Sequence, residues 1–205
     1  MLDHLVYATQ NVDRSVDELE SILGVRASPG GQHLGRGTRN ALIALGPTSY
    51  LEIVGPDLAQ PVPPAPRWFG VDTLTSPRIV TWAAKGANLE TARANAKRDG
   101  IDIGEVASGQ RTRTDGVELT WQLTSPLTTI ADGIVPFFID WSTSAHPAAT
   151  AARGLTLLGL RAEHPLPDEV QRMLALLGVT LNVRYASTSA LIATIDGPLG
   201  RIELR

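Results

Sequence analysis

The feature that most constrains the fold is a threefold repeat of one order of predicted elements: a strand, a helix and then further strands. The repeats cover residues 1–56, 78–142 and 154–205. In each repeat a helical pattern ends at a glycine followed by a β-branched residue: Gly24-Val25, Gly100-Ile101 and Gly178-Val179. Such units bury their apolar faces by packing on one another. The order predicts an α+β fold of βαβββ units, whose curved mixed sheets surround a cavity.

A proline-rich connector, residues 57–77, separates the first two units. Its segment DLAQPVPPAPRWFG holds four prolines, which exclude a helix interior and a central strand. We therefore expect a linker or a covering loop here. We also expect units one and two to share the main cavity, while the third unit extends a sheet or pairs in a homodimer; alternatively, units one and three pair around the cavity.

Composition excludes several classes of function. The 18 basic and 21 acidic residues give a formal net charge of −3, which does not favour binding to nucleic acid or to an anionic membrane surface. No apolar run approaches the roughly 20 residues of a membrane span, and no signal-peptide pattern opens the chain, so a cytoplasmic protein is expected. With no cysteine, histidine and carboxylate side chains are the available metal ligands.

The first strand, LDHLVYAT, places a histidine inside an apolar run. Strand alternation puts His4 on the same face as Val6, and in SYLEIVG it puts Glu52 on the same face as Val54. If both faces line the concave side of a sheet, the imidazole and the carboxylate meet there. They then bind a divalent metal such as Zn, Mn, Fe or Ni, or they form a buried hydrogen-bonded pair without metal.

These features carry a resemblance to a known superfamily. The order βαβββ, with the histidine of LDHLVYAT and the glutamate of SYLEIVG, resembles the vicinal oxygen chelate superfamily. Within it, GTRNALIALGPTSYLEIVGP and PFFIDWSTSAHP resemble the glyoxalase-like domain family, over nearly the whole chain. The resemblance implies the fold but not the reaction, because the superfamily includes isomerases, lyases, dioxygenases and binding proteins.

The resemblance also implies further metal ligands in the second unit. Asp140 of FFIDW matches the last-strand position and is expected as a third ligand or a general base; otherwise it caps Trp141 or nearby backbone donors. The matching first strand, RIVTWAAKG, offers no histidine or glutamine. His33, in the glycine-rich loop, is a substitute ligand or substrate contact, or else only a polar loop residue.

Four more residues are candidates for substrate contacts. Arg39 and Asn40 begin a strand, where they either orient a carbonyl or carboxylate of the substrate, with Arg39 in a catalytic role, or brace the glycine-rich loop. Trp82 and Trp121 either stack on a planar ligand or belong to the core.

The function expected from these residues is a divalent-metal-dependent enzyme of the lyase, isomerase or dioxygenase type, acting on a small oxygenated substrate. The metal would act as a Lewis acid. The alternative is a metal-free protein of the same fold that binds or sequesters a small molecule. A structural subunit is supported only by the spare third unit.

Overall fold

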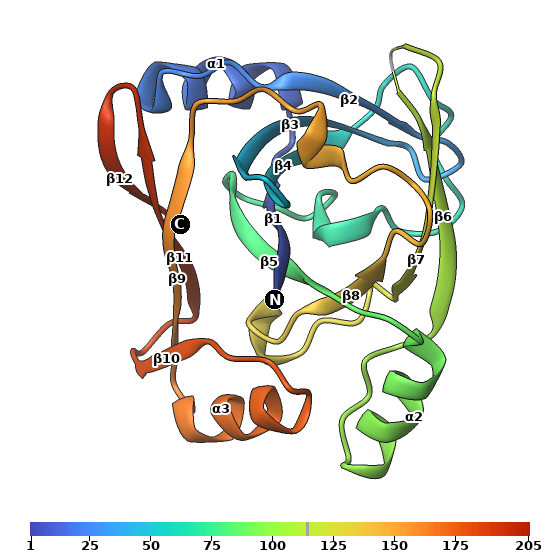
Figure 1. Cartoon of the computed structure of the whole chain (residues 1–205), viewed down its shortest axis with the longest axis vertical. Coiled ribbons are helices and arrows are strands. Elements are labelled where there is room, and N and C mark those ends of the chain that lie inside the picture. Colours follow the sequence, from blue (N-terminus) through green and yellow to red (C-terminus); the bar gives the residue numbers. More distant parts are fainter. Residues whose placement is uncertain (114) are drawn as a thin grey trace.

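The computed structural model describes residues 1–113 and 115–205, and it confirms the α+β fold of βαβββ units (Figure 1). The first unit consists of β1 (Leu2–Ala8), α1 (Val12–Leu23), β2 (Ser28–His33), β3 (Thr38–Gly46) and β4 (Ser49–Pro56). The second consists of β5 (Arg78–Lys85), α2 (Leu89–Arg98), β6 (Val106–Thr112), β7 (Glu118–Thr124) and β8 (Phe137–Asp140). The third consists of β9 (Thr156–His164), α3 (Pro167–Leu176), β10 (Asn182–Tyr185), β11 (Ala190–Gly197) and β12 (Gly200–Leu204).

The strands of the first two units close one barrel, in the order β1-β4-β3-β2-β6-β7-β8-β5. The units join at two seams: β1 pairs antiparallel with β5, and Gln32 of β2 pairs with Thr112 of β6. The third unit stays outside the barrel as a separate sheet in the order β10-β9-β11-β12. The cavity between units one and two is therefore the one that positions the candidate site.

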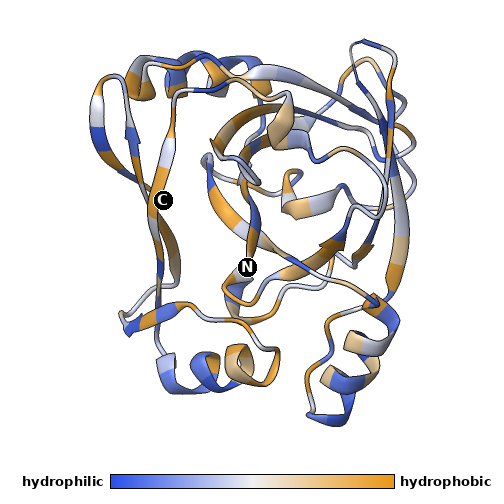
Figure 2. Cartoon of the chain, viewed as in Figure 1, coloured by the Kyte–Doolittle hydropathy of each residue, from blue (hydrophilic) through white to orange (hydrophobic). Residues whose placement is uncertain are grey.

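The barrel wall separates two hydrophobic cores. Along β1, Val6 and Ala8 pack inside the barrel, whereas Leu5 and Tyr7 pack outside it. The outer core is continuous with α1, α2 and the inner face of the third unit, so the separate sheet covers the outside of the barrel. Figure 2 shows the three helices with hydrophobic and hydrophilic residues on each, as expected for helices that cover a core with one side.

Helix α1 shows why the local sequence forms this element. The Asn11 side chain caps its first turn by accepting from the backbone N–H of Arg14, and Gly24 ends it in the left-handed conformation at φ 75°. Its apolar side chains at helical spacing, Val12, Val16, Leu19 and Leu23, are buried. Among the described helices, none is both long and apolar enough to cross a bilayer.

The proline-rich connector crosses one end of the barrel. Its short turn η1 (Trp68–Gly70) places Trp68 and Phe69 on the wall of the interior cavity. Arg67 fastens the turn by donating to the carbonyl of Gly37 at 2.8 Å and pairing with Asp72 at 2.6 Å. The connector is thus a cover over the candidate site.

Candidate active site

The barrel interior contains a cavity whose two halves differ in chemistry. The first unit supplies most of its polar side chains: His4, His33, Asn40, Tyr50 and Glu52. The second unit supplies an apolar wall of Trp121, Leu123, Phe137 and Ile139, together with the charged Arg111. The space open to water-sized molecules is about 20 Å³, roughly one water, so these side chains nearly fill the interior.

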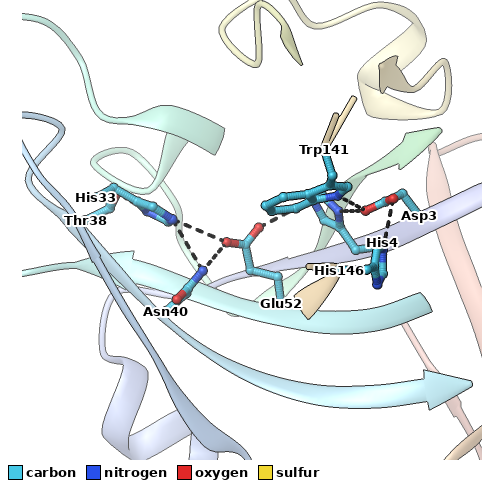
Figure 3. A network of polar contacts seen from close by, with 8 residues as sticks. All are labelled: Asp3, His4, His33, Thr38, Asn40, Glu52, Trp141 and His146. Carbon is cyan, nitrogen blue, oxygen red and sulfur yellow. Dashed lines mark hydrogen bonds and ion pairs between the residues drawn. The ribbon is translucent and has the colours of Figure 1, made fainter. Parts of the chain in front are cut away.

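His4 is oriented by the residue before it. Its Nδ1 lies 2.8 Å from Oδ1 of Asp3, and both side chains are buried (Figure 3). Simple alternation would place the two residues on opposite faces, but the β1–β5 register shifts between Leu2 and His4, so that Asp3 is an extra residue in β1. A bulge of this kind re-aims a side chain, which explains the contact.

Asp3 is the centre of a larger hydrogen-bond network. Besides His4, its carboxylate accepts from Nε1 of Trp141 at 3.2 Å and from Nε2 of His146 at 3.1 Å (Figure 3). Burial opposes ionisation of Asp3, but the hydrogen bonds from His146 and His4 outweigh it, so its pKa is far below the ordinary value. An ionised Asp3 only accepts, so His4 carries a proton on Nδ1 and its Nε2 faces the cavity.

Glu52 is held at one oxygen by a second network. Asn40 Nδ2 donates to Oε1 of Glu52 at 2.6 Å and to Nε2 of His33 at 3.3 Å. His33 then donates from Nδ1 to the hydroxyl of Thr38 at 2.9 Å. Burial lowers the pKa of His33 to about 4, against the opposing influence of Glu52, so His33 is neutral near pH 7.

The two networks meet across a gap. His4 Nε2 lies 3.6 Å from the second carboxylate oxygen of Glu52, which is too long for a hydrogen bond. The ring of Tyr50 stacks on the His4 ring at 4.6 Å between centroids, and burial raises the pKa of Tyr50, so its hydroxyl keeps its proton. The arrangement leaves one imidazole nitrogen and one carboxylate oxygen available to the same bound atom.

The donor set only partly fits a metal. His4 and Glu52 are suitable ligands, and in tetrahedral zinc sites ligand atoms about 2.1 Å from the ion lie roughly 3.4 Å apart. Within residues 1–113 and 115–205, however, no group of three or more histidine, aspartate or glutamate side chains is placed to share one ion. His33 does not complete the pair, because its Nε2 already accepts from Asn40.

The other predicted site residues lie at different places. Asp140 accepts from the backbone N–H of Ser142 at 2.8 Å and is not on the cavity wall. Arg39 points outside the barrel and pairs with Asp13 of α1 at 2.8 Å. Trp82 belongs to the outer core, where its Nε1 donates to the carbonyl of Ile134 at 2.8 Å, whereas Trp121 lines the cavity.

Several contacts in the site do not follow from strand periodicity. Alternation alone would put Asp3 on the face opposite His4, because a bulge leaves no mark in a short apolar run. His146 and Trp141 join the network from the connector after the second unit, a contact that strand periodicity does not predict. Arg111 lies in β6, a strand of mostly small and polar residues, so the sequence leaves open whether its side chain lines the cavity or faces solvent.

A closed barrel of two βαβββ units is the architecture expected from the resemblance to the vicinal oxygen chelate superfamily. The chain belongs to the glyoxalase-like domain family, whose sequence model matches residues 2–178. No curated protein matches the chain.

Solved structures with the same type of fold share little sequence with this chain. A hypothetical protein from Staphylococcus aureus aligns with a TM-score of 0.64 and 13% identity, over 92% of this chain and 87% of its own. Methylmalonyl-CoA epimerase from Streptomyces coelicolor aligns with a TM-score of 0.44 and 17% identity, over 70% of this chain and 96% of its own. The epimerase from Mycobacterium tuberculosis gives 0.43 and 18%, over 67% and 85%. At 13% identity, the likeness to the Staphylococcus aureus protein establishes the fold alone.

Proposed function

We propose that the barrel interior is the active site of an enzyme that moves a proton on a small oxygenated substrate. The observation that carries the proposal is the placement of His4 between two carboxylates. Asp3 binds Nδ1 at 2.8 Å, whereas Nε2 faces Oε2 of Glu52 across 3.6 Å without a hydrogen bond. An imidazole held by Asp3 in this way directs Nε2 at the cavity, where it can act as a general base.

The proton transfer follows from these contacts. His4 Nε2 takes a proton from the carbon next to a substrate carbonyl, and the electron pair of the broken C–H bond moves toward the carbonyl oxygen. The imidazolium that forms is stabilised by Asp3 on one side and Glu52 on the other. Protonation of a neighbouring carbon completes an isomerisation, and protonation of the same carbon on its opposite face completes an epimerisation; return of the proton to the original face restores the substrate. General-base catalysis of this kind contributes about 10²- to 10⁴-fold in rate.

A second candidate is the divalent-metal-dependent reaction expected from the sequence. It is favoured by the 3.6 Å separation of His4 Nε2 and Glu52 Oε2, which suits two ligands of one Zn, Mn, Fe or Ni ion. Such an ion would polarise a substrate carbonyl as a Lewis acid. With two side-chain ligands, its other positions would be filled by water and by substrate oxygens, or by Asp140 after movement of the end of β8.

Deuterium exchange distinguishes the two candidates. The protein is incubated in D₂O with a panel of small 2-oxo acids, hydroxyketones and ketones, and deuterium entering the carbon next to the carbonyl is followed by proton NMR. Exchange that persists with a chelator supports acid–base chemistry by the side chains alone. Exchange that requires added Zn, Mn, Fe or Ni supports the metal-dependent reaction. Ligand binding without exchange under either condition overturns both and favours a protein that binds or sequesters its ligand.

The homodimer and the cytoplasmic location expected from the sequence remain proposals. Strands β10 and β12 are the two edges of the third unit's sheet, and an edge strand offers unpaired backbone groups to a second copy. Light scattering after size-exclusion chromatography tests the dimer, and a monomer at micromolar concentration contradicts it.

A further inference from the structure

Arg111 lies in the barrel wall between two hollows. It projects from β6 and is only 3% exposed. On one side it borders the interior cavity that contains His4 and Glu52. On the other it borders a groove of about 140 Å³, whose wall includes Ser28, Arg113 and Thr150.

In the part of the chain that the structure describes, no carboxylate oxygen lies within 4.0 Å of the Arg111 guanidinium, so its charge has no partner of opposite sign in contact with it. Its hydrogen bond is to the carbonyl of Gly30. Burial lowers the pKa of Arg111, with Tyr50 and Glu52 opposing that effect from a distance, yet an arginine side chain remains protonated. A buried cation that lacks an anion is costly unless a ligand supplies one.

The guanidinium suits an oxyanion. It carries five N–H donors in a rigid fork, and a carboxylate or phosphate takes two of them in parallel. We infer that Arg111 binds an anionic oxygen group of the substrate, so that the substrate is a small organic acid with its carbonyl near the carboxylate. This inference rests on the proposed function, because it assigns the substrate class of the same cavity.

The charges in the cavity also orient such a substrate. Glu52 repels an anionic group, whereas Arg111 attracts it, so the anionic end lies toward β6. The remaining carbon atoms then lie toward His4 and the free oxygen of Glu52. The open space holds roughly one water, so side chains must move to admit such a substrate, and its alkyl part then contacts the apolar wall formed by Leu123 and Phe137. A phosphate makes the same contacts with Arg111, and the outer groove with Arg113 gives it room.

Matched pairs of probes test the inference on the unmodified protein. Quenching of tryptophan fluorescence reports binding, because Trp121 lines the cavity. The carboxylate pair is 2-oxobutyrate against 2-butanone, and the phosphate pair is hydroxyacetone phosphate against hydroxyacetone. At least one anion is expected to bind about tenfold or more tightly than its neutral partner. If the protein prefers the phosphate probe over its neutral partner, and this preference also decreases in Arg113→Gln, the phosphate binds in the outer groove.

Substitutions then test whether Arg111 is the side chain that causes the preference for anionic probes. Arg111→Gln is expected to lose the tenfold preference, and Arg111→Lys, which keeps the charge without the fork, to keep part of it. Arg161→Gln is the control, since Arg161 lies in β9 and pairs with Glu163 at 2.9 Å. Circular dichroism confirms that each variant is folded.

The outcomes separate this inference from the proposed function. Equal binding of charged and neutral probes by the unmodified protein overturns the role of Arg111, and so does a preference that survives in folded Arg111→Gln. Glu52→Gln is expected to keep anion binding while losing deuterium exchange. If no exchange occurs but anion binding depends on Arg111, the proposed proton transfer fails and the substrate class stands.

Discussion

The Nε2 atom of His4 lies 3.6 Å from the Oε2 atom of Glu52, too far for a hydrogen bond and close enough for one bound atom to contact both. Each residue is fixed from behind, His4 by Asp3 and Glu52 by Asn40. These contacts use Nδ1 of His4 and Oε1 of Glu52, so Nε2 and Oε2 keep their orientation and remain available to a bound atom.

Asp3→Asn is expected to destabilise the protein by about 2–4 kcal/mol, because it removes the anion that accepts from His4, His146 and Trp141. The hydrogen bonds depress the pKa of Asp3 in the folded state below its unfolded value. Asp3 therefore contributes stability above about pH 4, and that contribution is lost as the pH falls further. Urea unfolding between pH 3 and pH 7 measures the effect. A variant with the same steep acid loss as the wild type would contradict this role.

His33 is expected to make the stability of the protein depend on pH over a different range. The pKa of His33 in the folded state is about 4, below the ordinary value of 6.5. Between these two pH values the unfolded chain binds a proton at His33 and the folded chain does not. Stability should fall on the order of 3 kcal/mol as the pH drops from about 6.5 to about 4, and not further from this group. In His33→Gln the loss in that window should shrink. Equal slopes for both proteins in urea unfolding between pH 7 and pH 4.5 would exclude a neutral, buried His33.

Asn40→Asp places a second carboxylate beside Glu52 Oε1, which Asn40 Nδ2 now contacts at 2.6 Å. One of the two must stay protonated, so the variant should lose about 2 kcal/mol at pH 7. The two neighbouring carboxyl groups of the variant share a raised pKa in the folded state. The loss of unfolding free energy relative to the wild type therefore becomes smaller as the pH falls. Asn182→Asp, at an exposed position in β10, is the matched control and should change little. A pH-independent deficit in thermal unfolding would contradict the contact.

Gly30→Ala tests how closely β2 approaches Asn40. A Cβ at Gly30 would overlap the Oδ1 atom of Asn40, so the amide must move and release Glu52. We expect a loss of about 1–3 kcal/mol, together with weaker catalysis. Gly159→Ala is the control, because a Cβ at Gly159 meets nothing within 4 Å. Equal unfolding free energies for the two variants would show that the site tolerates the added methyl group.

The parts of the site that follow from strand periodicity could be predicted from the sequence. His4 and Glu52 alternate with apolar neighbours in strands β1 and β4, which pair in parallel with Val6 beside Glu52. The alternation therefore places both side chains inside the barrel. The repeat of strand, helix and strands also predicted the fold class, because the order of elements limits how curved sheets can close.

The remaining parts depend on irregular backbone and on contacts distant in sequence. Asp3 reaches His4 because β1 is bulged, and a single extra residue reverses the expected face. Arg111 reaches the cavity from β6, which pairs with β7 along its length but joins β2 at one residue pair, Gln32 and Thr112. Arg39 was expected at the substrate, but it is one residue from Asn40 and so faces the opposite side of β3, toward Asp13.

The measurement that most directly tests the central claim is deuterium incorporation at C3 of 2-oxobutyrate, with chelator present, in the wild type and in two site variants. His4→Gln and Glu52→Gln should each lower the rate by about 10²-fold or more. His164→Gln and Glu203→Gln, outside the barrel in the third unit, should retain it. Wild-type exchange that is unchanged in both folded site variants would contradict the account.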